Sequence, residues 1–179
     1  MKDTFKIRRA TEGDTNDICK IYNSYVRNSI VTFETTPVEA SIMEGRIKDK
    51  LTKYDWIVGE LNQRVVGYSY YGSFRPRAAY SHTVETTIYL SEENTGRGLG
   101  RALYTALIRS AKEKGFRELI GVIALPNPES VKLHKSLGFR EVGVLREIGH
   151  KFGKYVDVSL WQRSPETGHT TGSTGSTGC

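Results

Sequence analysis

The sequence predicts a single α/β domain over residues 1–163, in which a mixed and largely antiparallel sheet is flanked by helices. Three patterns predict this class. A strand passes through a glycine-rich loop into a helix at residues 84–111, and an apolar strand leads into a short helix at residues 116–138. Residues 56–71 are typical of a two-stranded hairpin.

The elements outside these two units follow from the spacing of apolar residues. A strand is expected at residues 5–9, and Thr11 with Asp14 is expected to begin a helix. Four side chains of that helix face inward at helical spacing: Ile18, Ile21, Tyr22 and Tyr25. Pro37 is expected to start a second helix that runs to about Leu51. The remaining strands are expected at residues 56–61 and 64–71, around the turn Asn62-Gln63, and at residues 140–149 and 156–162.

Residues 84–90 and the glycine loop behind them are the most informative stretch of the chain. Val84, Thr86, Ile88 and Leu90 alternate with Glu85, Thr87 and Tyr89, as in a strand with two different faces. Gly96, Gly98 and Gly100 then lead directly into a helix. Glycines let the backbone approach a ligand, unpaired N–H groups point at it, and the helix dipole favours its negative charge. The stretch therefore predicts a phosphate cradle.

Two familiar phosphate loops fit this stretch poorly. A Walker loop requires Gly-Lys-Ser/Thr, but Gly100 is followed by Arg101 and Ala102. A dinucleotide fingerprint needs glycine or alanine where Arg101 stands. The alternative to a cradle is an ordinary glycine-rich turn between a strand and an unrelated helix.

The short helix after the second strand has clear ends. Asn127 is a good N-cap, Pro128 suits the first helical position, and Glu129 suits the positive end of the helix dipole. Gly138 is expected to stop the helix.

The loop T-G-R-G-L-G resembles the acetyl-coenzyme A loop, Gln/Arg-x-x-Gly-x-Gly/Ala, of the GCN5-related N-acetyltransferase (GNAT) superfamily. Thr95 stands in the Gln/Arg place, which removes one possible pyrophosphate contact and leaves the backbone cradle. The short helix followed by Gly138-Phe139 also resembles that family, where it lies along the pantetheine arm. The resemblance implies acetyl-CoA as co-substrate and no metal. It assigns these residues to the cofactor: Ile88, Tyr89, Leu90, Gly96, Arg97, Gly98, Leu99, Gly100, Arg101, Asn127 and Ser130.

A narrower resemblance emerges from four segments taken together: V-E-T-T-I-Y-L, A-L-P-N-P-E-S-V-K-L-H, G-H-K-F-G-K-Y-V-D-V and L-W-Q-R. They are similar to the phosphinothricin acetyltransferase branch, which also contains methionine sulfoximine and methionine sulfone acetyltransferases. The similarity covers residues 5–163. It implies the GNAT acyl-CoA N-acyltransferase fold, in which the strands near Val84 and Phe116 run parallel and splay apart around the cofactor. It also implies a homodimer.

Acetyl transfer to an amine needs a deprotonated nitrogen, stabilisation of the carbonyl oxyanion, and a proton for the leaving thiolate. Glu85 matches the family's proposed general base, although a strand glutamate that faces solvent is the more common case from pattern alone. A backbone N–H near Leu90 is expected to meet the oxyanion. His134 takes the position from which many relatives protonate the thiolate, and it is equally readable as a packing or hydrogen-bonding residue.

The acceptor pocket is expected near the loop that precedes the Glu85 strand. Arg75 and Arg77 there are spaced to clamp a carboxylate or phosphinate, with Tyr80 close behind. In the resembling branch, Phe33 and these basic residues hold the amino-acid substrate, and Thr87 shares the face of Glu85. The alternative is an exposed basic loop that contributes to solubility.

The leading hypothesis is therefore direct acetylation of a small amino acid or analogue, with herbicide resistance as a possible incidental consequence. An acetyltransferase for protein or peptide N-termini is the alternative within the enzyme class. A module that binds acetyl-CoA without catalysis is the alternative from another class, and the presence of Glu85 counts against it.

Composition agrees with a cytoplasmic enzyme. The net charge is +6, but the basic residues are scattered and form no nucleic-acid motif, so no nucleic-acid partner is expected. No apolar run is long enough for a membrane span or a signal peptide. Cys19 is the only cysteine before the tail, and no metal-ligand spacing is present. Residues 164–179 are expected to be a flexible Gly/Ser/Thr tail of the kind added for expression.

Overall fold

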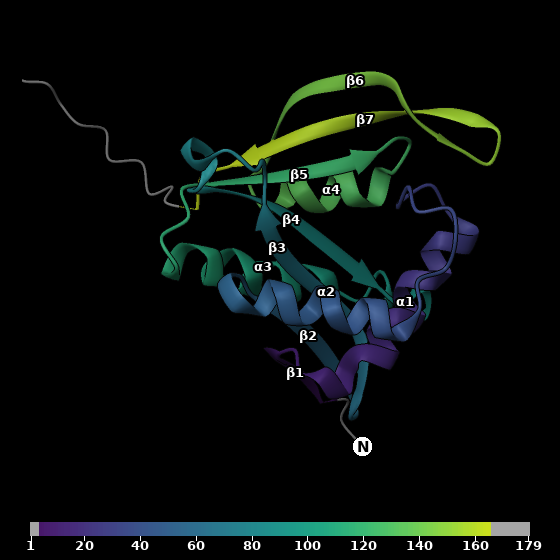
Figure 1. The fold of residues 1–179 in the computed structure, drawn as a ribbon, viewed down its shortest axis with the longest axis vertical. Coiled ribbons are helices and arrows are strands. Elements are labelled where there is room, and N and C mark those ends of the chain that lie inside the picture. Colours follow the sequence, from purple (N-terminus) through teal and green to yellow (C-terminus); the bar gives the residue numbers. More distant parts are fainter. Residues whose placement is uncertain (1–3, 166–179) are drawn as a thin grey trace, which may run out of the picture.

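The computed structural model describes residues 4–165. One sheet of seven strands carries helices on both faces, in the spatial order β1-β2-β3-β4-β5-β7-β6 (Figure 1). The strands are β1 (Phe5–Arg9), β2 (Trp56–Leu61), β3 (Arg64–Ser73), β4 (Thr83–Leu90), β5 (Glu118–Ala124), β6 (Arg140–Lys151) and β7 (Lys154–Arg163). The helices are α1 (Thr15–Asn28), α2 (Ala40–Lys53), α3 (Leu99–Glu113) and α4 (Pro128–Ser136).

Every pair of neighbouring strands is antiparallel except β4 and β5, which run parallel. Their pairing is short, from Thr83 opposite Glu118 to Thr86 opposite Gly121. Beyond that point β4 continues on β3 and β5 continues on β7, so the two strands separate. The predicted fold class and the predicted splay are both confirmed.

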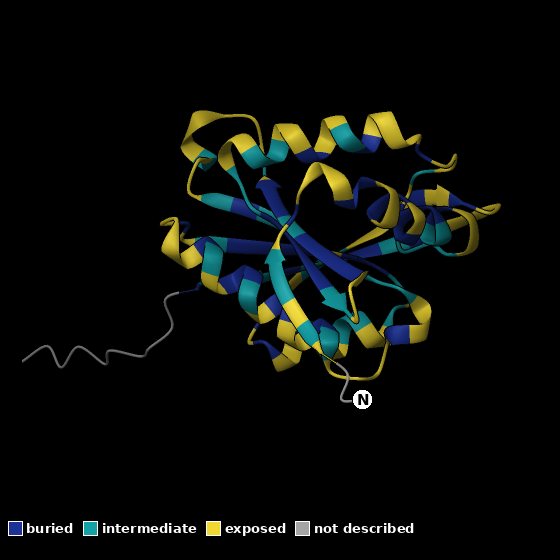
Figure 2. Cartoon of the chain, turned by 90° about the horizontal axis from the view of Figure 1, so that it is seen from below, coloured by how far each residue is buried: buried dark blue, intermediate teal, exposed yellow. Residues whose placement is uncertain are grey.

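Each face of the sheet has its own apolar core, and Figure 2 shows the buried strands at the centre with the outer helix surfaces exposed. Helices α1 and α2 cover one face through residues such as Ile18 and Ile47. Helix α3 covers the other face, where Leu103 and Leu107 are completely buried. Truncating either leucine to alanine would cost about 2–5 kcal/mol. The glycine loop and α4 are therefore attached to well-packed elements.

The predicted start of the second helix at Pro37 is wrong, because α2 begins at Ala40. The main chain of Val38 is instead extended and bonded to α1. Its N–H donates to Asn23 Oδ1 (2.8 Å), and its carbonyl accepts from Asn23 Nδ2 (2.9 Å). A residue whose peptide groups are held by another helix cannot take part in its own helical ladder, so the helix starts later.

The predicted start of the first helix is one short turn early. Thr11 and Asp14 do form a capping box, but around the 3₁₀ turn Glu12–Asp14 that precedes α1. Ser164, assigned to the tail, donates a hydrogen bond to Glu118 (2.8 Å). The rest of the predicted flexible tail, residues 166–179, lies outside the described residues. None of the helices within residues 4–165 is long and apolar enough to cross a membrane.

Candidate active site

A cavity of about 240 Å³ lies where β4 and β5 separate. Its walls come from both strands, from the segment before α2, and from α4. Eight residues assigned from the sequence line it: Phe33, Glu85, Thr87, Ile88, Tyr89, Asn127, Ser130 and His134. The facing edges of the strands carry no ladder bonds to one another beyond Thr86 and Gly121, so their peptide groups are available to a ligand.

Glu85 is the only carboxylate in this cavity lining. Its cross-strand neighbour on β3 is Gly72, which has no side chain to cover it. Burial raises the pKa of the Glu85 carboxyl, and the nearby Lys50 ammonium opposes that rise. A half-buried carboxylate with a raised pKa is a stronger base than an exposed one, which suits it to take a proton from an ammonium group.

The glycine loop joins the end of β4 to α3 in a conformation that needs glycine. Gly96 has φ +72° and Gly98 has φ +79°, and a Cβ at either position would meet no atom within 4 Å. Both therefore serve the left-handed backbone and leave the space beside it open. Gly100 has another role, since a Cβ there would lie 2.8 Å from Leu90 Cδ1. It lets the first turn of α3 pack on the end of β4.

The N-terminus of α3 is suited to an anion. Gly98 is its N-cap, no side chain caps the first turn, and no acidic residue lies in it. Arg101 does not cover this end, because its guanidinium donates to Ser136 at the end of α4. The first N–H groups of the helix and the positive end of its dipole thus face the open side of the loop, which is what a pyrophosphate requires. The residues present fit the phosphate-bearing co-substrate that the sequence predicts.

Helix α4 forms another wall of the site. The Asn127 side chain accepts the Ser130 N–H (3.1 Å), which confirms the predicted cap, and Gly138 has φ +81° after the last turn. Leu90, at the end of β4, is held from the other side because its carbonyl accepts the Tyr25 hydroxyl (2.6 Å).

Both ring nitrogens of His134 are already in hydrogen bonds. Nδ1 donates to the Ser130 carbonyl (2.8 Å), and Nε2 lies 3.1 Å from the Tyr104 hydroxyl. Burial lowers the pKa of His134, and the Ser130 contact only partly offsets it. A neutral ring that donates from Nδ1 must accept at Nε2. This geometry favours the hydrogen-bonding interpretation of His134 over the general-acid one.

Three residues predicted to hold the acceptor do not line the cavity at Glu85: Arg75, Arg77 and Tyr80. They lie on the loop that leaves β3 at Ser73 and enters β4 at Thr83, two residues before Glu85. Arg75 lies over the rings of Phe74 and Tyr80, with its guanidinium 5.2 Å and 5.9 Å from their centroids. The loop therefore stands beside the site at the end of β4 opposite the glycine loop.

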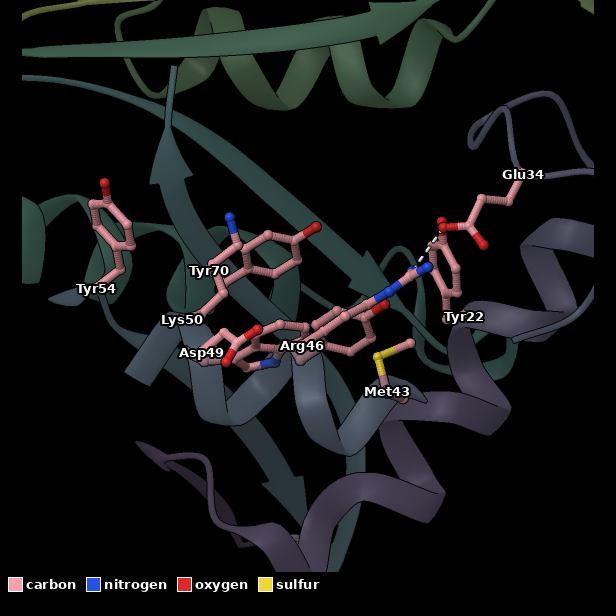
Figure 3. Close-up of a pocket in the computed structure, with 10 residues that line it drawn as sticks. Tyr22, Glu34, Met43, Arg46, Asp49, Lys50, Tyr54 and Tyr70 are labelled. Atoms are coloured by element: carbon pink, nitrogen blue, oxygen red, sulfur yellow. Dashed lines mark hydrogen bonds and ion pairs between the residues drawn. The ribbon is translucent and has the colours of Figure 1, made fainter. Parts of the chain in front are cut away.

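Sequence reasoning missed a second cavity, of about 440 Å³, on the same face of the sheet (Figure 3). Tyr70 lines both cavities. The second is also lined by Arg46 and Lys50 from α2 and by Trp56 from β2. Only the strand alternation of residues 56–70 hinted at this, because it puts aromatic side chains on one face, and that pattern is also typical of a core. No group of three His, Cys, Asp or Glu side chains that could hold a metal occurs within residues 4–165.

Comparison with known proteins identifies the class to which this fold and site belong. The family profile described as "Acetyltransferase (GNAT) domain" matches residues 7–160. The chain belongs to the GNAT family of acetyltransferases, as its glycine loop and splayed strands predict.

Three relatives narrow the likeness within that family. Phosphinothricin N-acetyltransferase of Streptomyces viridochromogenes is 40% identical over 161 residues, which cover 90% of this chain and 88% of that protein. The L-methionine sulfoximine/L-methionine sulfone acetyltransferase of Pseudomonas aeruginosa is 32% identical, with coverage of 87% and 92%. A phosphinothricin acetyltransferase of Sinorhizobium meliloti, solved with acetyl-CoA, is 36% identical with a TM-score of 0.87 and coverage of 90% and 88%. The resemblance predicted from the sequence is confirmed.

Proposed function

We propose that this enzyme transfers the acetyl group of acetyl-CoA to the α-amino group of a small amino-acid analogue of the phosphinothricin or methionine sulfoximine type. The observation that carries the proposal is Glu85, a half-buried carboxylate with a raised pKa in the cavity between the splayed strands. The names of the relatives support this acceptor class, and the complex of the Sinorhizobium meliloti protein supports the co-substrate.

In this mechanism Glu85 takes a proton from the acceptor ammonium, directly or through a water. The free amine then attacks the acetyl carbonyl, so that a C–N bond forms while the C–S bond to coenzyme A breaks. A backbone N–H near Leu90 stabilises the negative charge that grows on the carbonyl oxygen. The thiolate leaves with the electron pair of the C–S bond, and the proton lost by the amine restores the thiol.

Acetyl-CoA supplies an activated acetyl group and a good leaving thiolate. The chain binds its pyrophosphate with the backbone of residues 96–101, and the assigned residues Ile88, Tyr89, Asn127 and Ser130 line the slot for its arm. In this proposal His134 keeps α4 and β5 in place rather than donating a proton. A Cβ at Gly121 would lie 2.6 Å from its Nε2, so the glycine lets the ring rest against β5.

The acceptor is held from two sides. Arg75 and Arg77 attract its acidic groups from the loop before β4, with Tyr80 ordering Arg75. Phe33 covers it from the segment before α2, where the ring packs on Gly149 of β6. Thr87 lies beside Glu85 on the same strand face.

We also propose a cytoplasmic homodimer. The edge strand β6 and its partner β7 expose apolar side chains, among them Ile148, Phe152 and Tyr155. An exposed apolar patch of this kind supports an interface between two copies. Cys19 is free and buried, which is compatible with a reducing compartment. Sedimentation velocity at several concentrations tests the dimer, and a monomer at every concentration would contradict it.

The test of the proposed function is release of free coenzyme A from acetyl-CoA with a panel of amines. The panel contains phosphinothricin, methionine sulfoximine, methionine sulfone, common amino acids, an aminoglycoside and a peptide. Turnover confined to amino-acid analogues supports the proposal. Turnover only with the peptide or the aminoglycoside, or none with bound acetyl-CoA, would overturn it.

A further inference from the structure

The cavity of about 440 Å³ beside the candidate active site has a composition that the proposed mechanism does not use. It lies between α2 and the sheet, and Figure 3 shows Lys50 and Tyr70 side by side, with Arg46 extended toward Glu34. The cavity is large enough for the side chain of an amino acid. Because Tyr70 also lines the cavity at Glu85, the two spaces adjoin.

The register of three strands explains why they adjoin. Trp56 on β2 is opposite Tyr70 on β3, and Tyr70 is opposite Thr87 on β4. These residues share one face of the sheet, on which Glu85 follows two positions from Thr87. A molecule whose amine lies at Glu85 therefore reaches the second cavity by crossing Tyr70.

The first sign of a missing ligand is the indole N–H of Trp56. Trp56 is 2% exposed and lines the cavity, and its Nε1 has no hydrogen-bond partner within residues 4–165. Its ring stacks on Tyr70 with centroids 4.1 Å apart, which fixes the direction of the N–H. A buried donor without an acceptor costs free energy, so an acceptor atom supplied by a ligand would bind favourably there.

The second sign is the ammonium of Lys50. It lies 5.8 Å and 5.7 Å from the ring centroids of Tyr54 and Tyr70. In the described part of the chain no carboxylate pairs with it, although it interacts electrostatically with Glu85. The other charges that line the cavity are Arg46 and Glu34, which pair at 2.6 Å, and the exposed Asp49. Lys50 is therefore the cation in this cavity that is ready for an anionic or strongly dipolar oxygen.

We propose that this cavity binds the side chain of the acceptor amino acid, and that Trp56 and Lys50 donate to an oxygen at its end. This inference rests on the proposed function, since it assumes an α-amino acid with its amine at Glu85. The stacked rings of Trp56 and Tyr70, with Met43, contact the apolar body of the side chain. The occupant is thus a side chain that ends in sulfonyl, phosphinyl or carboxylate oxygens.

The proposal makes Trp56 and Lys50 specificity-determining residues. Methionine and methionine sulfone have the same chain length and differ in the oxygens on sulfur. With the sulfone, both donors are satisfied; with methionine, both stay unpaired next to an apolar group, which is unfavourable. The enzyme should therefore bind the sulfone more tightly than methionine, and that preference should depend on the two residues.

The experiment measures the affinity of the full-length protein for methionine sulfone and for methionine by calorimetry in the presence of coenzyme A, and kcat/KM for both. The variants are Trp56→Phe, which keeps an aromatic ring and removes the N–H, and Lys50→Met, which keeps the apolar stem and removes the charge. Lys48→Met is the matched control, because Lys48 lies on the same helix with its ammonium on Glu44 (2.7 Å). Thermal melting of each variant checks that it folds.

We expect Trp56→Phe to weaken sulfone binding about fivefold to tenfold and Lys50→Met about tenfold or more, with methionine binding within about twofold of wild type. Lys48→Met should leave both affinities unchanged. Lys50→Met should also move the acidic limb of the rate profile to higher pH for both substrates, because it removes the charge that lowers the pKa of Glu85.

Equal losses for the two ligands, or no loss, would overturn this inference while leaving the proposed function intact. Should Trp56→Phe fail to fold, Lys50→Met decides alone. Selective sulfone binding without acetylation by the wild-type protein would overturn the proposed function and retain the inference. Failure of the wild-type protein to bind either ligand would overturn both.

Discussion

Replacing Gly98 by alanine should weaken acetyl-CoA binding about fivefold to thirtyfold. Gly98 is the N-cap of α3 at φ +79°, and nothing lies within 4 Å of the position that a Cβ would take. The substitution therefore causes no collision and acts only on the backbone. For a residue with a side chain the left-handed conformation costs about 1–2 kcal/mol. At 1.4 kcal/mol per factor of ten, that cost corresponds to the stated loss of affinity.

The loss should appear in binding because the loop is open. In the free variant the loop can relax away from the left-handed conformation, and the co-substrate must then restore it. Gly115 provides a matched control at the opposite end of α3, since it has the same φ of +79° and the same open surroundings. Gly115→Ala should lower the melting temperature by about 2–8 °C, the equivalent of 1–2 kcal/mol for a chain of this size, and leave acetyl-CoA affinity unchanged.

Calorimetric titration of both variants with acetyl-CoA measures the difference, and thermal melting reports stability alongside. Wild-type affinity in Gly98→Ala would refute the assignment of the loop to the pyrophosphate. An equal loss of affinity in Gly115→Ala would show that general destabilisation of α3, rather than the cradle, controls binding.

The remaining predictions concern a base, an ion pair and a histidine. Glu85→Gln should lower kcat/KM about 10²- to 10⁴-fold without loss of acetyl-CoA binding, and the wild-type rate should rise with pH across the raised pKa of Glu85, because only the deprotonated carboxylate accepts a proton; full turnover by the variant across a pH–rate series would disprove the base. Asp14→Asn should lower the free energy of unfolding by about 2 kcal/mol, because it removes a two-point contact with Arg8 at 2.8 Å. Burial alone would raise the pKa of Asp14, but hydrogen bonds from Arg8 and neighbouring groups lower it, so the difference should be full above about pH 4 and shrink as pH falls through the lowered value; urea titrations that give equal losses at pH 7 and pH 3 would contradict this. His134→Gln should reduce the melting temperature, as should Tyr104→Phe, while kcat and the alkaline limb of the pH–rate profile stay within a few-fold of wild type; a loss of 10²-fold or more with a flattened limb would restore the general-acid role.

The parts of the fold that the sequence predicted correctly depend on residues close together in the chain. Asn127 caps α4 through Ser130, three residues away, and the turn at Asn62-Gln63 adopts the positive φ angles that a tight hairpin needs. The glycine loop and its helix likewise form within a few residues. In each case the physical cause is local, so a single sequence contains it.

The parts that sequence reasoning missed depend on contacts between distant segments. The start of α2 moved from Pro37 to Ala40 because Asn23, on another helix, binds the main chain of Val38. The cavity at Trp56 and Lys50 combines β2 and α2 with the face of β3, and no pattern within one element shows that these side chains meet. Strand register and helix docking decide such sites, and neither is written in local spacing.

Alternation along β4 explains how one strand serves both the chemistry and the support of the site. Glu85 faces α2 and the acceptor side, where Gly72 leaves room beside it. The next residue, Thr86, faces α3 and lies 2.6 Å from the Tyr104 hydroxyl, which in turn contacts His134. A register slip of one residue would exchange the two faces and put the carboxylate into the core under α3. The short parallel pairing of β4 with β5 therefore has two effects: it fixes the register that points Glu85 at the acceptor, and by ending at Thr86 it opens the slot in which that carboxylate can act.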